Sequence, residues 1–191
     1  MPRVTSTFLP FLTVGALSLL ASLAPAQNGN VVGKENHAAT LRAMVVLKIA
    51  PYLTVAGGEK RKEFRIGIVG EDSVTAVAEK LLSGKKVDTA TVKVVVIDVA
   101  TAAKGKDVGK YDLLYLATAI GKDDLAAIVK VHAEKAVPLV SERDGFAASG
   151  GSVQLFVKDN GLRFEVNGDA LKKQGLEASS HLLKLSQKGP E

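Results

Sequence analysis

Short apolar runs alternate with helical stretches through the middle of the chain, and this alternation limits the fold more than any other feature. The strand-like runs cover residues 64–69, 91–99, 113–117 and 136–140. Helical patterns open at 71–73 and span 122–135, which gives the order strand, helix, strand, crossover, strand, helix, strand. Right-handed crossovers place such helices on both faces of a parallel sheet. The sequence therefore predicts one α/β domain with a mostly parallel sheet flanked by helices.

Three local features refine this prediction. A helix is expected over residues 34–55, with Pro51 weakening its end. The run Val94–Ile97 is apolar on both faces, which is typical of an interior strand covered by helices. Pro138 indicates an edge or bulged position for the strand over 136–140, because proline cannot donate to the sheet.

The last third leaves this rhythm and predicts a β-hairpin followed by a helix. Two alternating apolar runs flank Asn160-Gly161, a pair that favours a two-residue type I′ turn. With that turn, Asp159 pairs with Leu162 and Lys158 lies beside Arg163. The fold class expected is thus a single-domain, mostly parallel α/β sheet with a C-terminal β-hairpin and helix.

The N-terminus has the pattern of a secretory signal peptide. A short basic start, an apolar run and an Ala24-Pro25-Ala26 site predict a signal peptide over 1–26, cleaved after Ala26. The alternative is a retained membrane anchor, since the apolar run is nearly long enough to span a bilayer. Residues 27–34 are expected to be a flexible lead-in and 35–188 the folded domain. No later stretch predicts a membrane span, so the mature protein is expected to be soluble and exported.

Charge and cysteine content exclude several classes of function. The first 26 residues hold one Arg and no acid, so the rest keeps 24 Lys and Arg against 20 Asp and Glu. This small excess is dispersed along the chain, which favours a solvated surface, or one that stays near an anionic membrane face, over nucleic-acid binding. The chain has no cysteine, which excludes thiol catalysis, disulfides and Cys-ligated metals.

Motifs for catalysis and cofactors are weak. The turn at 70–73 (Gly-Glu-Asp-Ser) lies where phosphates bind in nucleotide folds, but two acids stand where an anion would sit, so a plain turn is favoured. The histidines His37, His132 and His181 are far apart in sequence, and no serine nucleophile motif is present. We therefore expect no enzyme activity, no metal and no cofactor.

The loop after the fourth strand, residues 144–151, is bracketed by Asp144-Gly145 and Gly150-Gly151, and we call it the glycine loop. It is the best cleft candidate, because ligands in open α/β sheets sit beyond the carboxyl ends of strands. Its alternative role is a turn into the hairpin. Arg163 and Asn167 project from one strand face and serve either a ligand or a polar structural network. Ser179 and Ser180 fit an N-cap pair. The candidate ligand- or partner-binding residues are Asp144, Gly150, Gly151, Arg163, Asn167, Ser179 and Ser180.

These same residues resemble a known family. The pattern Asp144-Gly145-Phe146, Gly150-Gly151, Arg163-Phe164-Glu165-Val166-Asn167, Gly175-Leu176, Ser179-Ser180 and Leu182-Leu183-Lys184-Leu185 is similar to the YfiR family of exported bacterial proteins. Upstream, 64–70 resembles the family's first strand and 112–116 its central strand. The chain departs from the family in two ways: the end of its first helix has no Trp, and it has none of the redox-responsive cysteines that several members carry.

The resemblance implies a non-catalytic periplasmic regulator. Its expected partner is the periplasmic part of an inner-membrane signalling protein such as a diguanylate cyclase, which the regulator represses to lower cyclic-di-GMP signalling. The resemblance and an edge strand near Pro138 suggest a homodimer. The alternative function is a periplasmic small-ligand sensor, or an adaptor for another membrane signalling system, with Arg163 forking onto an anionic ligand beside the glycine loop.

Overall fold

The computed structural model describes residues 28–55, 62–106 and 108–191, and the predicted signal peptide lies outside these ranges. In chain order the elements are α1 (Asn28–Ile49), η1 (Ala50–Tyr52), β1 (Leu53–Val55), β2 (Glu63–Val69), α2 (Ser73–Leu82), β3 (Lys86–Val87), β4 (Ala90–Ile97), α3 (Val99–Ala103), η2 (Val108–Lys110), β5 (Leu113–Leu116), α4 (Lys122–His132), β6 (Leu139–Ser141), β7 (Val153–Lys158), β8 (Gly161–Val166), α5 (Gly168–Lys173), β9 (Leu176–Ala178) and α6 (Ser180–Leu185).

Seven strands form one sheet in the order β3-β4-β2-β5-β6-β7-β8, and β1 pairs with β9 in a separate small sheet. The five strands from β4 to β7 run parallel, while β3 and β8 are antiparallel at the two edges. The predicted fold class is therefore confirmed: one α/β domain with a mostly parallel sheet, a C-terminal hairpin (β7–β8) and a C-terminal helix (α6).

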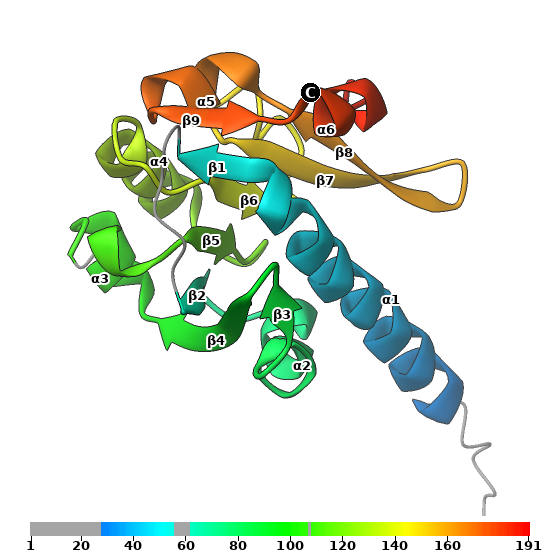
Figure 1. Cartoon of the computed structure of the whole chain (residues 1–191). Coiled ribbons are helices and arrows are strands. Elements are labelled where there is room, and N and C mark those ends of the chain that lie inside the picture. Colours follow the sequence, from blue (N-terminus) through cyan, green and yellow to red (C-terminus); the bar gives the residue numbers. More distant parts are fainter. Residues whose placement is uncertain (1–27, 56–61, 107) are drawn as a thin grey trace, which may run out of the picture.

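The two faces of the sheet are covered by different helices (Figure 1). On one face, α1 and α2 pack with the β1–β9 pair over a core that includes Ile66, Leu113 and Leu155. On the other face, α3 and α4 cover a second core around Leu116 and Phe146. Burial of these Val, Leu and Ile side chains is the main force that holds the helices to the sheet.

The hairpin turn differs from the predicted one. Lys158 pairs with Gly161, so the two turn residues are Asp159 and Asn160, whose φ angles of 51° and 57° suit a type I′ turn. The predicted pair of Lys158 and Arg163 is therefore wrong, since Arg163 lies opposite Phe156. The register is displaced by two residues, which keeps every side chain on its predicted face.

The first helix also differs from the prediction at both ends. It begins at Asn28, inside the stretch expected to be a flexible lead-in, and ends at Ile49 rather than at Val55. Pro51 has no N–H to donate and disfavours helical geometry at the preceding residue, so the chain forms the short turn η1 and then strand β1.

The prediction for Pro138 is wrong, and the prediction for β4 holds except at Val96. Pro138 immediately precedes β6, which is an interior strand between β5 and β7, so the proline removes no bond within the strand. Strand β4 lies between β3 and β2 and contributes to both cores, through Val92 and Val94 on one face and Val95 and Ile97 on the other, but Val96 is 52 % exposed. Its outer neighbour β3 has only two residues and pairs with Ala90 and Thr91 alone.

The C-terminal tail, residues 186–191, lies along the outer edge of β8. Ser186 Oγ accepts a hydrogen bond from the Val166 N–H (2.8 Å), and the Gln187 N–H donates to the Phe164 carbonyl oxygen (2.9 Å). The tail thereby satisfies backbone groups that an edge strand would otherwise expose.

Candidate functional site

The strand order places a topological switch point between β2 and β5. From β2 the chain moves outward to β4 through α2, and it then returns to the other side of β2 as β5. The helices α2 and α3 consequently lie on opposite faces of the sheet. In open α/β sheets, ligands bind at such a point, beyond the carboxyl ends of the strands. This edge of the sheet is therefore the first place to look for a site.

Four side chains form a polar network there, which we call the switch-point network: Arg42, Asp72, Tyr115 and Glu142. The Tyr115 hydroxyl lies 3.1 Å from Asp72 Oδ2 and 3.1 Å from Glu142 Oε1. Arg42 Nε donates to Glu142 Oε2 at 2.5 Å. The network therefore joins α1 to the carboxyl ends of β2 and β6 through a tyrosine of the central strand β5.

Asp72 has two roles, one for each carboxylate oxygen. Oδ1 accepts from the N–H groups of Val74 and Thr75 and caps α2 in a capping box. Oδ2 accepts from the Thr118 N–H (3.2 Å) and contacts the Tyr115 hydroxyl. The turn at 70–73 is thus the plain strand-to-helix turn that the sequence favours, and its acid faces inward across the switch point.

Burial controls the protonation of the network. Burial, followed by the Glu142 and Asp72 carboxylates, raises the pKa of Tyr115 above its ordinary value, so the phenol stays neutral. Burial also raises the pKa of Glu142, while the Arg42 guanidinium and the Tyr115 hydroxyl oppose that rise. A phenol carries a single hydrogen and can donate to only one of the two carboxylates. The network can therefore accept one further proton, and Glu142 is the group that burial prepares for it.

The network is closed on itself. Within the described residues, no buried side-chain nitrogen or oxygen is without a hydrogen-bond partner. Two carboxylates, a phenol and a guanidinium bond to one another here and join α1 to the sheet. These side chains bond to one another at the place where doubly wound enzymes bind their cofactors.

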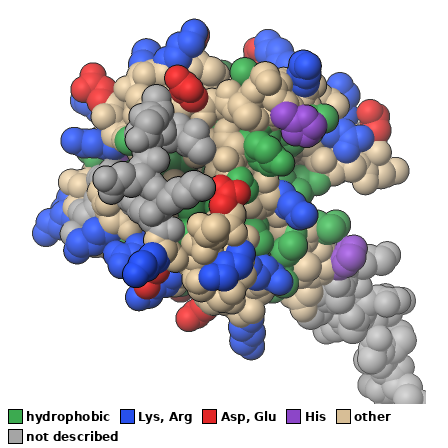
Figure 2. Space-filling view, in the orientation of Figure 1, with side chains coloured by type: hydrophobic (Ala, Val, Ile, Leu, Met, Phe, Trp, Pro, Cys, Tyr) green, Lys and Arg blue, Asp and Glu red, His purple; other side chains and the backbone are tan. Residues whose placement is uncertain are grey.

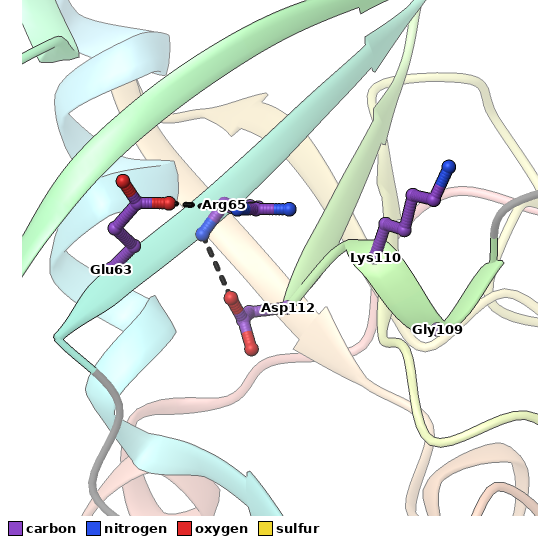
Figure 3. A pocket seen from close by; sticks show the side chains of 5 residues that line it. All are labelled: Glu63, Arg65, Gly109, Lys110 and Asp112. Carbon is purple, nitrogen blue, oxygen red and sulfur yellow. Dashed lines mark hydrogen bonds and ion pairs between the residues drawn. The ribbon is translucent and has the colours of Figure 1, made fainter.

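An open hollow of about 250 Å³ lies at the opposite, amino end of the strands (Figure 3). It is lined by Glu63, Arg65, Gly109, Lys110 and Asp112. Arg65 Nη2 pairs with Glu63 Oε2 at 2.9 Å, and the Arg65 N–H donates to Asp112 Oδ2 at 2.8 Å. The hydrogen bond from Arg65 lowers the pKa of Glu63. Because the Arg65–Glu63 pair is half exposed, water screens it and it adds little stability.

The C-terminal tail bonds to the start of the glycine loop that the sequence predicts as a cleft. The Pro190 carbonyl oxygen accepts from the Gly145 N–H (3.1 Å) and from Gln154 Nε2 (2.9 Å). Asp144 itself is exposed. A Cβ on Gly151 would come within 2.2 Å of the Phe146 ring, so this glycine makes room for a buried aromatic side chain.

Of the next two predicted site residues, Asn167 bonds to the glycine loop and Arg163 lies apart from it. Asn167 caps α5 through Oδ1, and its Nδ2 donates to the Ala147 carbonyl oxygen (2.7 Å) in the glycine loop. Arg163 lies near the turn of the hairpin, where Nη1 donates to the Leu162 carbonyl oxygen (3.2 Å).

The other glycine and the two serines have local roles. Gly150 has a φ of 98°, which a residue with a side chain rarely adopts. Ser179 Oγ caps α6 by accepting from the Leu182 N–H (3.1 Å), as predicted for an N-cap, and Ser180 is the exposed first residue of that helix.

The switch-point network was not among the residues that the sequence predicts as a site. A signal was present: Asp72 follows β2 and Glu142 follows β6, and polar residues directly after parallel strands meet at one edge of the sheet. Arg42 gives no such signal, because it lies far away on α1 and reaches Glu142 only through the packing of that helix.

A comparison with protein-family models gives a match to the family described as YfiR/HmsC-like, over residues 39–187. The chain belongs to the YfiR/HmsC-like family. The matched span contains the whole sheet, the switch-point network and the tail as far as Gln187. No curated protein matches the chain. At the level of the family, membership supports a periplasmic regulator that acts in cyclic-di-GMP signalling.

Proposed function

We propose that the protein is a non-catalytic periplasmic regulator that binds the periplasmic part of an inner-membrane signalling protein, such as a diguanylate cyclase, and represses it. The observation that carries this proposal is the match of residues 39–187 to the YfiR/HmsC-like family. The signal-peptide pattern of residues 1–26 supports export and cleavage after Ala26. In the part of the chain that the structure describes, no helix has the length and apolar character to cross a membrane.

Exposed apolar side chains support a protein partner. Among the described residues, large apolar side chains are exposed on α1, η1, β4, β7 and α6, namely Leu41, Tyr52, Val96, Val157, Leu183 and Leu185. Figure 2 shows apolar side chains along the notch between α1 and the β7–β8 hairpin. The Tyr52 and His181 rings, 5.9 Å apart, join η1 to α6 beside it. Apolar patches of this kind are typical of protein–protein interaction sites.

A role without catalysis is supported by the hydrogen-bonded side chains at the switch point. Doubly wound enzymes bind their ligands there, and in this protein the Tyr115 hydroxyl bonds to Asp72 and Glu142 at that place. A sensor that binds a small ligand at the glycine loop is less well supported, because such a ligand would have to displace Pro190 from Gly145 and Gln154.

Direct binding tests the proposal. The exported protein would be titrated into the purified periplasmic segments of each inner-membrane diguanylate cyclase of its host, with calorimetry as the readout. We expect saturable binding to one segment, and weaker binding when Leu183 on the exposed face of α6 is replaced by Lys. Absence of binding to every segment, with the protein folded by circular dichroism, would overturn the proposal of a cyclase repressor.

A further inference from the structure

The outer edge of β4 is open beyond its first residues. The Thr91 N–H and the Ile97 carbonyl oxygen bond towards β2, so alternate residues from 91 to 97 face β2. The backbone groups of Val92, Val94 and Val96 consequently point to the other side. Val92 exchanges hydrogen bonds with Lys85 and Gly84. Within the described residues, no strand pairs with β4 beyond the two residues opposite β3.

The opposite edge of the sheet, strand β8, is covered, unlike the edge at β4. Strand β8 is covered by the tail through Ser186 and Gln187. Natural proteins protect open edges with charges, prolines or bulges, because bare backbone groups recruit another strand. The open stretch Val94–Val96 has none of these, and Val96 exposes 52 % of its surface. An uncharged run of β-branched residues at an open edge is typical of a strand that pairs with a strand of another chain.

We propose that this edge binds the same edge of a second copy of the chain, antiparallel, with the two-fold axis at Val95. In this register Val94 of each copy lies opposite Val96 of the second copy. Each of these two pairs exchanges both backbone hydrogen bonds, which makes four bonds in total. Val96, now exposed, becomes flanked by the valines of the neighbouring strand. The inference does not depend on the proposed function.

The register follows from the outward backbone groups of Val94 and Val96, which have no hydrogen-bond partner among the described residues. Placing Val94 opposite Val94 of the second copy would set Val96 against Val92, whose outward groups already bond Lys85 and Gly84. Placing Val96 opposite itself would set Val94 against Asp98, whose carbonyl oxygen accepts from the Ala102 N–H in α3. Only pairing about Val95 uses both free residues of each copy.

Charge favours a second copy in the antiparallel direction. The uncharged stretch has Lys93 at one end and Asp98 at the other, and both are exposed. Antiparallel pairing brings the Lys93 end of one copy to the Asp98 end of the second copy, whereas parallel pairing would bring like charges together. The edge is therefore complementary to itself, as a two-fold interface requires.

A single introduced cysteine tests the register, because the chain has none of its own. In the proposed dimer the two Val95 residues form a non-hydrogen-bonded pair with Cα atoms about 4.5 Å apart, which suits a disulfide. Lys93→Cys is the matched control: it is more exposed, but its two copies would lie more than about 10 Å apart. We expect Val95→Cys, and not Lys93→Cys, to form a covalent dimer under mild oxidation. Cross-linking of Lys93→Cys as readily as Val95→Cys, or no cross-linking of Val95→Cys, would overturn the register.

Sedimentation equilibrium of the exported protein tests the surface itself. We expect a reversible dimer, and a dissociation constant raised about tenfold or more by Val96→Lys, because an edge lysine opposes strand pairing. Val157→Lys is the control, since Val157 is 63 % exposed on a different strand and should leave the dimer unchanged. A wild-type chain that stays monomeric at every concentration, or equal effects of the two substitutions, would refute the proposed interface.

Discussion

Gly151 gives the most direct test of how the glycine loop is built, and the substitution is Gly151→Ala. An ideal Cβ at this position lies 2.2 Å from Phe146 Cε1, 2.4 Å from Cδ1 and 2.5 Å from Cζ. Ordinary contacts begin near 3.4 Å, so the ring must retreat by about 1 Å. Phe146 is only 1 % exposed and belongs to the core beneath α4. Overpacking of this kind costs about 1–3 kcal/mol.

The expected result is a fall in melting temperature of about 2–12 °C, since about 1 kcal/mol corresponds to about 2–4 °C for a chain of this size. Circular dichroism melts and urea titrations measure it. Gly168→Ala is the control: nothing lies within 4 Å of its Cβ and it opens α5, so this variant should melt at or above the wild-type temperature. The double variant Phe146→Leu with Gly151→Ala should lose less stability than the two single variants lose in sum, because the smaller side chain leaves room for the added methyl group.

A Gly151→Ala variant that melts within about 1 °C of wild type would refute the packing argument. If such a variant also lost control of cyclic-di-GMP, Gly151 would belong to a binding surface, which is the other role that the sequence leaves open for it.

The remaining predictions concern the switch-point network and one helix cap. Tyr115→Phe removes the hydroxyl between Asp72 and Glu142 and should lower the free energy of unfolding by about 1–3 kcal/mol in urea titrations; an unchanged value would mean that water replaces the hydroxyl at no cost. Burial raises the pKa of Glu142, so its contribution to stability is full below its ordinary pKa of 4.5 and is lost as pH rises through the raised pKa. The stability of wild type relative to Glu142→Gln should therefore fall with rising pH, and a rise would contradict the assignment. Ser179→Ala removes the cap of α6 and should cost about 1 kcal/mol in the same titrations, whereas Ser180→Ala should be nearly neutral; equal costs would argue against the cap.

The architecture could be read from the sequence because each parallel strand is a short apolar run and each connection has a helical period. The hairpin shows the limit of this method. The sequence predicts correctly which side chains share each face of the hairpin, but it predicts a turn at Asn160-Gly161, whereas the turn lies at Asp159-Asn160. A displacement of two residues leaves an alternating pattern unchanged, so the pattern alone cannot choose between the two registers.

The site was harder to predict because its residues meet only in the folded chain. Arg42 and Glu142 are 100 positions apart in sequence, and their ion pair depends on how α1 packs across the sheet. The sequence singles out Gly150, Gly151 and Asn167, and in the structure each has a local role: a positive φ, room for the Phe146 ring and the cap of α5. The contact of the tail with the glycine loop could not be foreseen, since residues 186–191 show no periodic pattern.

Deletion of the gene in the native host, followed by measurement of cyclic-di-GMP, tests the proposed function most directly. The account predicts a rise in cyclic-di-GMP on deletion. Expression of the full chain should reverse the rise, and expression of a chain that lacks residues 1–26 should not, because it would remain in the cytoplasm. An unchanged cyclic-di-GMP level on deletion, or full reversal by the chain without residues 1–26, would contradict a periplasmic repressor of a diguanylate cyclase.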